Sequence, residues 1–280
     1  MKCIKGAKED FHNQDDFAIY AKRNTCAFGV FDGHGPTGDA LSNFVQSFMF
    51  ARLIKHLSLV GAKRLEAELV DIFQTCHKEC KLNDAAVNDK TQFDCSGSGA
   101  TATIAIIYGN ELVVACVGDS RCVLGIEMKR DSGMFKCVEL SEDHAPDRPD
   151  ERRRIEKAGG VIKRLAGDVP FRVFLKGKSY PGLAMTRSIG DVCGEDAGIV
   201  PDPEIRRYKL DPKKQSFLVL ASDGVWEFLS SEDVVAIVSQ FDSTTTQEAV
   251  EAVVEAAVGK WKQFSPFAID DITCIISWLT

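Results

Sequence analysis

Apolar runs of strand length in this chain end next to aspartates, and this feature constrains the possible folds more than any other. Such runs are typical of β-strands that are buried within a sheet. The aspartates and their runs are Asp32 after 27–31, Asp119 after 112–118, Asp223 after 217–222 and Asp270 before 272–278. Because strands that belong to one sheet system bring their ends together, we expect these carboxylates to converge.

A cluster of carboxylates needs positive charge among its members. Two carboxylates about 4 Å apart repel each other by roughly 4 kcal/mol at an effective dielectric constant near 20. Oxygen ligands select hard cations such as Mg²⁺ or Mn²⁺. The aspartates therefore predict a binuclear metal centre and, with it, a hydrolase.

The composition excludes several other classes of protein. The chain has 280 residues with a net charge of −7, which argues against a general binder of nucleic acid or of anionic membranes. Its apolar runs are far shorter than the ~20 residues that span a bilayer, so no membrane insertion is expected. The ten cysteines include no Cys-x-x-Cys pair, and no signal sequence precedes them. We therefore expect reduced thiols in an intracellular protein of the cytoplasm, the nucleus or both.

The periodicity of apolar residues predicts the class of fold. Strands are expected at 17–20, 26–31, 101–108, 112–117, 121–126, 217–222 and 272–278, with a hairpin turn at Gly109-Asn110. Helical stripes cover 41–57, 65–80 and 250–261. Thr245-x-x-Glu248 predicts a capping box for the last helix, and Ser231 predicts the cap of a short helix that ends at Val238.

Adjacent strand pairs and adjacent helix pairs favour an α+β fold over a doubly wound parallel sheet. We expect a four-layer sandwich, in which two mainly antiparallel β-sheets are flanked by helices on both outer faces. The chain is expected to form a single domain over residues 1–280. Within it, residues 147–198 are rich in Arg, Gly and Pro, and they predict an irregular, flap-like excursion near the strand ends.

Single motifs of this chain also have simpler interpretations. Asp32-Gly33 and Asp223-Gly224 can be tight turns, and Gly118-Asp119 can be the turn of a hairpin. Asp270 can be an edge charge that prevents the pairing of sheets between molecules. The joint pattern of aspartates at strand ends is what favours a metal site.

Eight segments together resemble the metal-dependent serine/threonine protein phosphatases of type 2C, in the order of that family and across nearly the whole chain. The segments are Asn-Gln-Asp-Asp-Phe at 13–17, Val-Phe-Asp-Gly-His-Gly at 30–35, Ser-Gly-Ser-Gly-Ala-Thr at 96–101, Val-Gly-Asp-Ser-Arg at 117–121, Leu-Ser-Glu-Asp-His-Ala-Pro-Asp-Arg-Pro-Asp-Glu at 140–151, Leu-Ala-Met-Thr-Arg-Ser-Ile-Gly-Asp at 183–191, Ser-Asp-Gly-Val-Trp-Glu at 222–227 and Asp-Asp-Ile-Thr at 270–273. The resemblance implies a protein phosphatase whose substrates are phosphorylated proteins, and we expect a monomer.

The resemblance also implies a ligand set for two Mn²⁺ or Mg²⁺ ions. Asp32 would bridge the two ions, Asp223 and Asp270 would hold one, and the Gly33 carbonyl would contact the other. Two ions about 3.5–4 Å apart can share a hydroxide of lowered pKa and direct it at phosphorus. Their charge also stabilises the oxygens of the transferred phosphoryl group.

Three further roles follow from the same resemblance. Asp119 matches a third and weaker metal site, which would also involve Asp223 and Glu227. Asp15 would order metal-bound water. His34 is the best placed proton donor for the leaving serine oxygen, which is otherwise a poor leaving group.

The group that binds the substrate phosphate is where this chain departs from the family. Many animal members place an arginine five residues before the aspartate that matches Asp15. This chain has Asp10 there, so Lys8, or Lys5, would have to take that role. Gln14 also replaces a frequent glutamate, and Asp271 replaces a frequent asparagine.

Two alternative functions remain open at this stage. A catalytically inactive binding protein of the same fold is one, although such a protein would be expected to lose Asp32, Asp223 or Asp270. A hydrolase of small phosphorylated metabolites is the other, because its metal centre would look the same. Cys76, His77 and Cys80 have a spacing that suggests a metal site, but both cysteines lie on a helical apolar stripe and are expected to be buried thiols.

Overall fold

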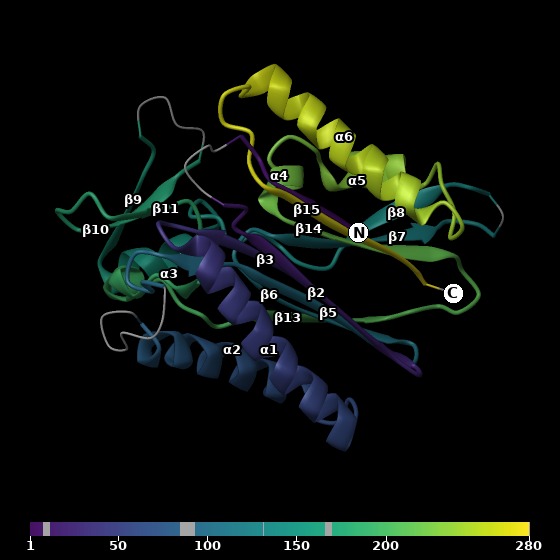
Figure 1. The fold of residues 1–280 in the computed structure, drawn as a ribbon, viewed down its shortest axis with the longest axis horizontal. Coiled ribbons are helices and arrows are strands. Elements are labelled where there is room, and N and C mark those ends of the chain that lie inside the picture. Colours follow the sequence, from purple (N-terminus) through teal and green to yellow (C-terminus); the bar gives the residue numbers. More distant parts are fainter. Residues whose placement is uncertain (8–11, 85–92, 131, 166–169, 280) are drawn as a thin grey trace.

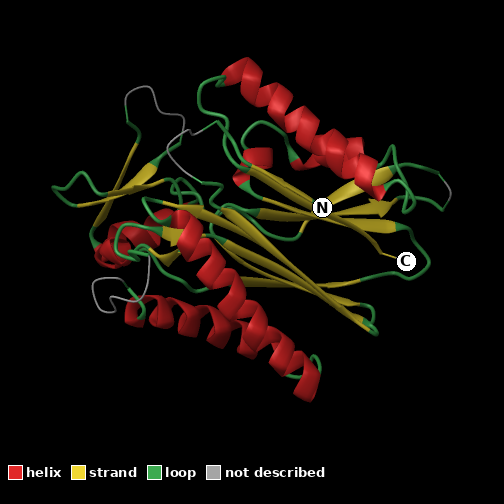
Figure 2. Ribbon diagram, in the orientation of Figure 1, coloured by secondary structure: helices red, strands yellow, loops and turns green. Residues whose placement is uncertain are grey.

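Two β-sheets lie face to face, and helices cover the outer surface of each sheet, so that the chain forms four layers (Figures 1 and 2). The computed structural model describes residues 1–7, 12–84, 93–130, 132–165 and 170–279. All pairings between its named strands in these ranges are antiparallel. The predicted α+β sandwich is therefore confirmed.

The first sheet has the strand order β12-β4-β3-β5-β6-β13, and β2 pairs with β3 beside this path. Its strands are β2 (Asp15–Lys22), β3 (Thr25–His34), β4 (Gly99–Ala100), β5 (Ala102–Tyr108), β6 (Glu111–Val117), β12 (Ile189–Gly190) and β13 (Glu204–Lys209). Strands β5 and β6 form the hairpin that Gly109-Asn110 predicts.

The second sheet has the order β1-β15-β14-β7-β8. Its strands are β1 (Lys2–Ile4), β7 (Arg121–Glu127), β8 (Phe135–Glu139), β14 (Ser216–Ala221) and β15 (Ile272–Leu279). Alternate residues of β14 pack into two different hydrophobic cores. Phe217 and Val219 face the outer helices, whereas Leu218 and Leu220 face the first sheet. This double burial explains why the strand is an unbroken apolar run in the sequence.

Two helices cover each sheet. Helices α1 (Gly38–Val60) and α2 (Leu65–Leu82) pack on the first sheet, while α5 (Ser231–Val238) and α6 (Thr246–Phe264) pack on the second. The predicted buried positions on α2 are confirmed, Cys76 and Cys80 among them. A single turn of helix, α4 (Asp223–Trp226), follows β14.

Both predicted helix caps are wrong in detail. Helix α5 is capped by Ser230, whose side chain forms a capping box with Asp233. Ser231 instead donates to Glu139, because its side chain turns inward. Thr245 makes no capping hydrogen bond with the backbone of α6, since its hydroxyl binds Asp242.

The segment 147–198 is more regular than its sequence predicts. It contains α3 (Pro149–Ala158), the strands β9 (Gly160–Lys163), β10 (Arg172–Leu175) and β11 (Pro181–Leu183), the strand β12 and a 3₁₀ helix (Val192–Ala197). Strands β9 to β11 form a small antiparallel sheet beside the sandwich (Figure 1). Strands of three or four residues are too short to show a period in sequence, which is why this region looked irregular.

None of the helices in the described ranges combines the length and apolar character needed to cross a bilayer. The ten cysteines all lie within the described residues, and each is an unpaired thiol.

Candidate active site

The ends of β2 and β3 place two of the predicted carboxylates side by side. Asp15 begins β2 and stands opposite Asp32 in the register of the two strands. The end of β3 is tied to the start of the next strand, because the Asp32 carbonyl accepts from the Thr101 N–H (2.8 Å) and Thr101 Oγ1 accepts from the Asp32 N–H (3.0 Å). These hydrogen bonds fix the backbone on which Asp32 is mounted.

A serine joins the ends of β14 and β15 to Asp15. The Ser222 N–H donates to the Thr273 carbonyl (3.1 Å), and Ser222 Oγ accepts from the Thr273 N–H (3.0 Å). Its hydroxyl donates to Asp15 Oδ2 at 2.7 Å. Asp223 follows Ser222 directly, so this one side chain connects the carboxylates of the two sheets.

Asp119 lies where the chain crosses between the sheets. It follows β6 of the first sheet and precedes β7 of the second, so the connection is not a hairpin turn. The neighbouring Ser120 Oγ is 2.7 Å from Thr101 Oγ1, which links this crossing to the end of β3. The strand-end aspartates therefore come together from both sheets, as the sequence predicts.

We call Asp15, Asp32, Asp119, Asp223 and Asp270 the aspartate cluster. Withdrawal from water and the charges of the four other members raise the pKa of Asp32 well above its ordinary value. Desolvation and the charges of Asp119, Asp270 and Asp15 act likewise on the pKa of Asp223. Mutual repulsion within the cluster is thus large, and a bound cation would relieve it.

Two oxygens of the cluster support the same conclusion. Burial raises the pKa of Asp15 to about 7, although a hydrogen bond from Ser222 opposes the rise. Desolvation and the charge of Asp143 raise the pKa of Asp119 to about 7. Oδ1 of Asp15 and Oδ1 of Asp119 are buried and have no hydrogen-bond partner among the described residues. A set of anionic oxygens with unsatisfied acceptors fits hard divalent cations.

Gly33 and Gly224 are required by close backbone approaches. A Cβ atom on Gly33 would lie 2.2 Å from the Gly38 carbonyl oxygen, and one on Gly224 would lie 2.0 Å from the Asp271 carbonyl oxygen. Both aspartates that precede these glycines belong to the aspartate cluster. The two Asp-Gly steps are therefore sites where the backbone packs tightly beside a carboxylate.

His34 ends β3 beside the cluster, and its charge lowers the pKa of Asp119 against the effects of burial and of Asp143. Its Nε2 atom is 2.6 Å from Oδ2 of Asp191, which sequence analysis did not single out. Lys8, predicted to bind the substrate phosphate, lies outside the described residues.

Two residues of the matched segments, Gln14 and Asp271, have supporting contacts that the sequence does not predict. Asp271 accepts hydrogen bonds from the N–H groups of Gly6 (2.7 Å) and Gln14 (2.8 Å), and it thereby fixes the segment that leads to Asp15. The Gln14 amide donates to the Gly35 carbonyl at 2.8 Å. The matched segments 13–17 and 270–273 include these two residues, but nothing local in the sequence indicates which backbone groups they bind.

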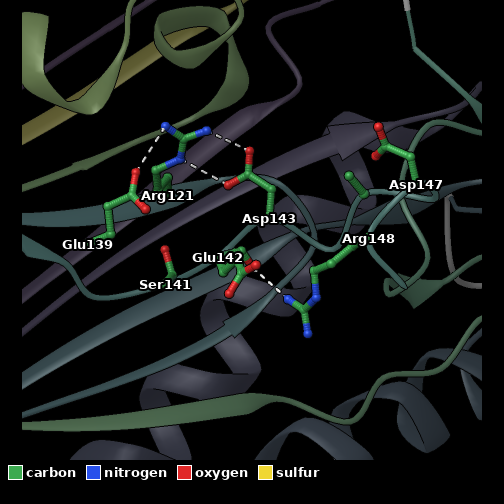
Figure 3. Close-up of a pocket in the computed structure, with 8 residues that line it drawn as sticks. Arg121, Glu139, Ser141, Glu142, Asp143, Asp147 and Arg148 are labelled. Atoms are coloured by element: carbon green, nitrogen blue, oxygen red, sulfur yellow. Dashed lines mark hydrogen bonds and ion pairs between the residues drawn. The ribbon is translucent and has the colours of Figure 1, made fainter. Parts of the chain in front are cut away.

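An open pocket of about 340 Å³ is lined by residues that include Arg121, Asp143 and Arg148 (Figure 3). Asp143, whose charge acts on Asp119, lines it and accepts from two nitrogens of Arg121 at 3.0 and 2.8 Å. The aspartate cluster itself is not part of its lining. The aspartate cluster is therefore identified as the candidate site by its charges and hydrogen bonds, and not by this pocket.

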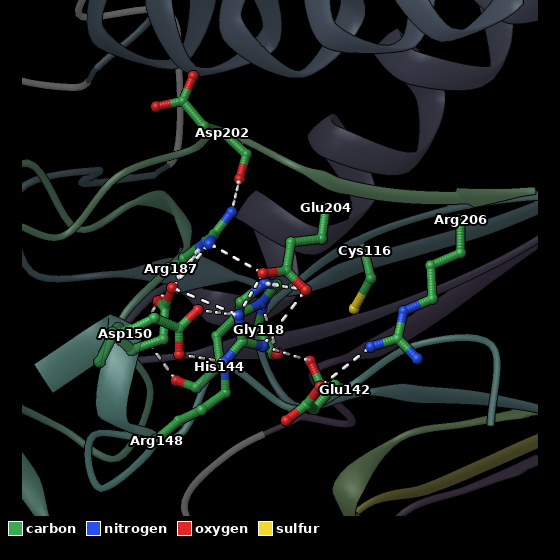
Figure 4. Close-up of polar contacts among 12 residues, drawn as sticks. Cys116, Gly118, Glu142, His144, Arg148, Asp150, Arg187, Asp202, Glu204 and Arg206 are labelled. Carbon is green, nitrogen blue, oxygen red and sulfur yellow. Dashed lines mark hydrogen bonds and ion pairs between the residues drawn. The ribbon is translucent and has the colours of Figure 1, made fainter. Parts of the chain in front are cut away.

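A second acidic cluster lies where α3 meets the start of β13 (Figure 4). The oxygens of Asp150, Glu151 and Glu204 are close enough for one metal ion to bind them together. However, three guanidinium groups occupy this space already. We call these six residues the glutamate–arginine network: they are Asp150, Glu151, Glu204, Arg148, Arg154 and Arg187.

Glu151 is the centre of this network and is only 1% exposed. It accepts from Arg154 and Arg187, each at 2.6 Å, and from the hydroxyl of Thr186. Burial alone would raise its pKa, but these donors hold the pKa well below the usual range. The network is an internally neutralised ion-pair cluster, and it is a poor candidate for the metal site.

Comparisons with known proteins agree with the geometry. The family model described as protein phosphatase 2C matches residues 7–260. "Probable protein phosphatase 2C 72" of Arabidopsis thaliana is 36% identical over 275 residues, which cover 95% of this chain and 81% of the relative. "Probable protein phosphatase 2C 64" of Oryza sativa subsp. japonica is 38% identical over 254 residues, which cover 90% of this chain and 58% of the relative.

The solved serine-threonine phosphatase 2C of Toxoplasma gondii has the same fold, with a TM-score of 0.78 at 20% identity, over 100% of this chain and 93% of that one. A sex determining protein of C. elegans gives a TM-score of 0.76 at 21% identity, over 100% of this chain and 64% of that one.

Proposed function

Because the chain belongs to the protein phosphatase 2C family and is therefore a metal-dependent serine/threonine protein phosphatase, we propose that the aspartate cluster is its metal centre. The observation that carries this proposal is the convergence of carboxylates whose charges raise one another's pKa. The Arg-paired glutamates of α3 and β13 offer no comparable excess of negative charge.

Carboxylates and a backbone carbonyl are the ligands in this proposal. Asp32, Asp223, Asp270 and the Gly33 carbonyl would together hold two Mn²⁺ or Mg²⁺ ions. When bound, the ions supply the positive charge and the activated water that hydrolysis of a phosphomonoester needs. The protein positions these ligands through Thr101 and Ser222, which tie the strand ends together.

Asp119 and Asp15 take the remaining roles near the ions. We assign Asp119 to a third, weaker cation site, because it lies at the crossing between the sheets and Glu227 acts on its pKa. Asp15 orders water beside the main pair, and its Ser222 hydrogen bond leaves Oδ1 to accept from that water.

A metal titration tests the centre. Chelator should abolish activity, and Mn²⁺ or Mg²⁺ should restore it. Calorimetry on the chelated protein should then resolve two tight sites and one weaker site. Asp119→Ala should remove only the weaker site and increase the metal concentration needed for turnover. Full activity in chelator, or loss of all bound ions from Asp119→Ala, would contradict the assignment.

His34 is proposed as the general acid that protonates the leaving serine oxygen. A serine alkoxide leaves poorly, whereas nitrophenolate leaves without help, and positioned general acids contribute roughly 10²–10⁴-fold. His34→Gln should therefore slow hydrolysis of a phosphoserine peptide much more than that of nitrophenyl phosphate. Equal losses with unchanged metal content would mean that His34 only shapes the loop.

The substrate side of the proposal is a monomer that acts on phosphorylated proteins inside the cell, in the cytoplasm or nucleus. Lys8 remains the proposed partner of the substrate phosphate, and Lys8→Ala should raise KM for phosphopeptide. Phosphopeptides and free phosphometabolites, compared at equal concentration, distinguish this function from that of a metabolite phosphatase. Preferred hydrolysis of the metabolites would overturn it.

A further inference from the structure

The imidazole of His34 contacts a buried carboxylate. The distance between His34 Nε2 and Asp191 Oδ2 is 2.6 Å, and the Asp191 side chain is only 2% exposed. Asp191 lies 157 positions further along the chain, after β12, so the contact is tertiary. A short hydrogen bond to a buried carboxylate fixes both the position of a ring and its rotation.

The backbone of Asp191 is shaped for this contact. Its φ of +48° lies in the left-handed region, which residues other than glycine seldom occupy. Its N–H donates to the Ser98 carbonyl at 2.9 Å. A Cβ atom on Gly99 would lie 2.0 Å from Asp191 Oδ2, so this strand has room for the carboxylate only because residue 99 is glycine.

The other face of the same loop is anchored to α2. The Gly190 N–H donates to His77 Nδ1 at 3.2 Å, and His77 Nε2 is 2.7 Å from Glu195 Oε1. Lys81 donates to both oxygens of Glu195 at 2.8 and 2.9 Å. The loop is therefore braced on both sides, and the Asp191 carboxylate has little freedom to move.

Asp191 is separate from the metal ligands proposed above. The carboxylates that act most strongly on Asp32 are Asp15, Asp223, Asp270 and Asp119. Asp191 instead faces His34, whose charge acts on Asp119. Its contact is therefore with the proton donor and not with the ions.

We propose that Asp191 is a positioning residue, which holds the His34 ring in the orientation from which it donates a proton to the leaving oxygen. This proposal rests on the role of His34 as general acid. As the oxygen of the attacking water bonds to phosphorus, the electron pair of the breaking P–O bond stays on the serine oxygen, which takes a proton from the His34 ring.

The test compares variants of Asp191 on two substrates. Asp191→Gly removes the carboxylate and accepts the positive φ without strain. It should raise the ratio of kcat/KM for nitrophenyl phosphate to that for a phosphoserine peptide by roughly 10- to 100-fold, as misplaced catalytic groups do. Asp191→Asn keeps an acceptor oxygen and tolerates the left-handed region, so it should restore most of the wild-type ratio. Metal content, measured by elemental analysis, should stay unchanged.

Glu195→Gln is the matched control, because it loosens the same loop on the α2 side without touching His34. It should leave the ratio at the wild-type value. His34→Gln should change the ratio by itself, and adding Asp191→Gly to it should change the ratio no further. If Asp191→Gly does not fold, Asp191→Ser removes the carboxylate in its place.

The outcomes separate the two proposals. If His34→Gln shifts the ratio and Asp191→Gly does not, or if Asp191→Gly slows both substrates alike, the positioning role is wrong while the acid role stands. If His34→Gln itself leaves the ratio unchanged, the acid role is wrong and the positioning role falls with it.

Discussion

The aspartate cluster and the glutamate–arginine network are two groups of carboxylates that behave in opposite ways. The pKa values of Asp32 and Asp223 are raised, by desolvation first and by neighbouring aspartates next. The pKa values of Glu151 and Glu204 are lowered, because donors from arginines outweigh the effect of burial. The proximity of acidic side chains therefore does not identify a metal site, and the charges that surround them do.

The two regions also serve different purposes in the fold. The network joins α3 to β13, since Arg148 binds both Asp150 and Glu204. His144 packs beneath it and contacts Gly118, the residue before Asp119, at 3.0 Å. A region that is neutralised internally can thus hold in place a neighbouring region that must stay negative.

The largest expected effect is the loss of activity on substitution of the bridging aspartate. Asp32→Ala should abolish tight metal binding and lower turnover by roughly 10³-fold or more, because the charge-stabilising centre is lost. The matched control is Asp150→Asn, which removes a carboxylate from the network. Calorimetry and phosphopeptide kinetics should show near-normal metal binding for the control. Metal loss in Asp150→Asn instead would reverse the assignment of the two clusters.

A large loss of stability is expected in the network. Glu151→Gln leaves guanidinium groups without their central partner, and breaking a buried ion pair costs about 3–5 kcal/mol. Urea unfolding should show this loss as a lower midpoint with an unchanged m-value. Glu156→Gln on the same helix is the control, because its pair with Arg152 (3.4 Å) is exposed. It should cost less than about 0.5 kcal/mol.

The sequence predicts the centre of the site better than its supports. Strand-end aspartates follow from apolar runs, and the fold follows from the same runs, so Asp32, Asp119 and Asp223 could be placed together. The supporting roles of Ser222 and Asp191 could not be predicted. Their hydrogen bonds join residues that are 157 or more positions apart, and such contacts leave no local pattern in the sequence.

Two parts of the fold were outside the reach of local sequence for similar reasons. The connection at Gly118-Asp119 looks like a hairpin turn in the sequence. It is not one, because β7 pairs with β14 and therefore lies in the other sheet. Strands β9 to β11 are too short for a period and are ordered by packing of Val173 and Ile199 beside α3.

Opposite pH dependence should separate the two regions in the metal-free protein. The pKa of Asp15 is raised to about 7, so the folded state binds more protons than the unfolded state between about pH 4 and 7, and stability falls as pH rises. Burial, and next the charge of Arg187, lower the pKa of His144 to about 4. Between about pH 4 and 6.5 the unfolded state then binds more protons, and stability rises with pH.

Single variants divide these two contributions. Asp15→Asn should make the slope of unfolding free energy against pH more positive, and His144→Gln should make it more negative, each by up to about 1.4 kcal/mol per pH unit. Denaturant unfolding in chelator at pH 5, 6 and 7 measures both slopes. If both variants changed the slope in the same direction, Asp15 and His144 would not have opposite effects on the pH dependence of stability.

The smallest expected effect is on the stability of the Asp32→Asn variant. Its difference from the wild type in free energy of unfolding should change sign when metal is added. In chelator, Asp32→Asn removes a carboxyl whose ionisation is opposed by burial and by the charges of its neighbours, so the free energy of unfolding should rise by roughly 1 kcal/mol. With saturating Mn²⁺ the order should reverse, because a cation at 100 times its Kd stabilises the wild type by about 2.7 kcal/mol and the variant has lost a bridging ligand. Thermal unfolding with and without metal measures both differences. Glu151→Gln should destabilise the protein in both conditions, since arginines of the chain itself neutralise that region. If Asp32→Asn also destabilised the protein in chelator, burial and repulsion would not make this carboxyl unfavourable in the metal-free protein.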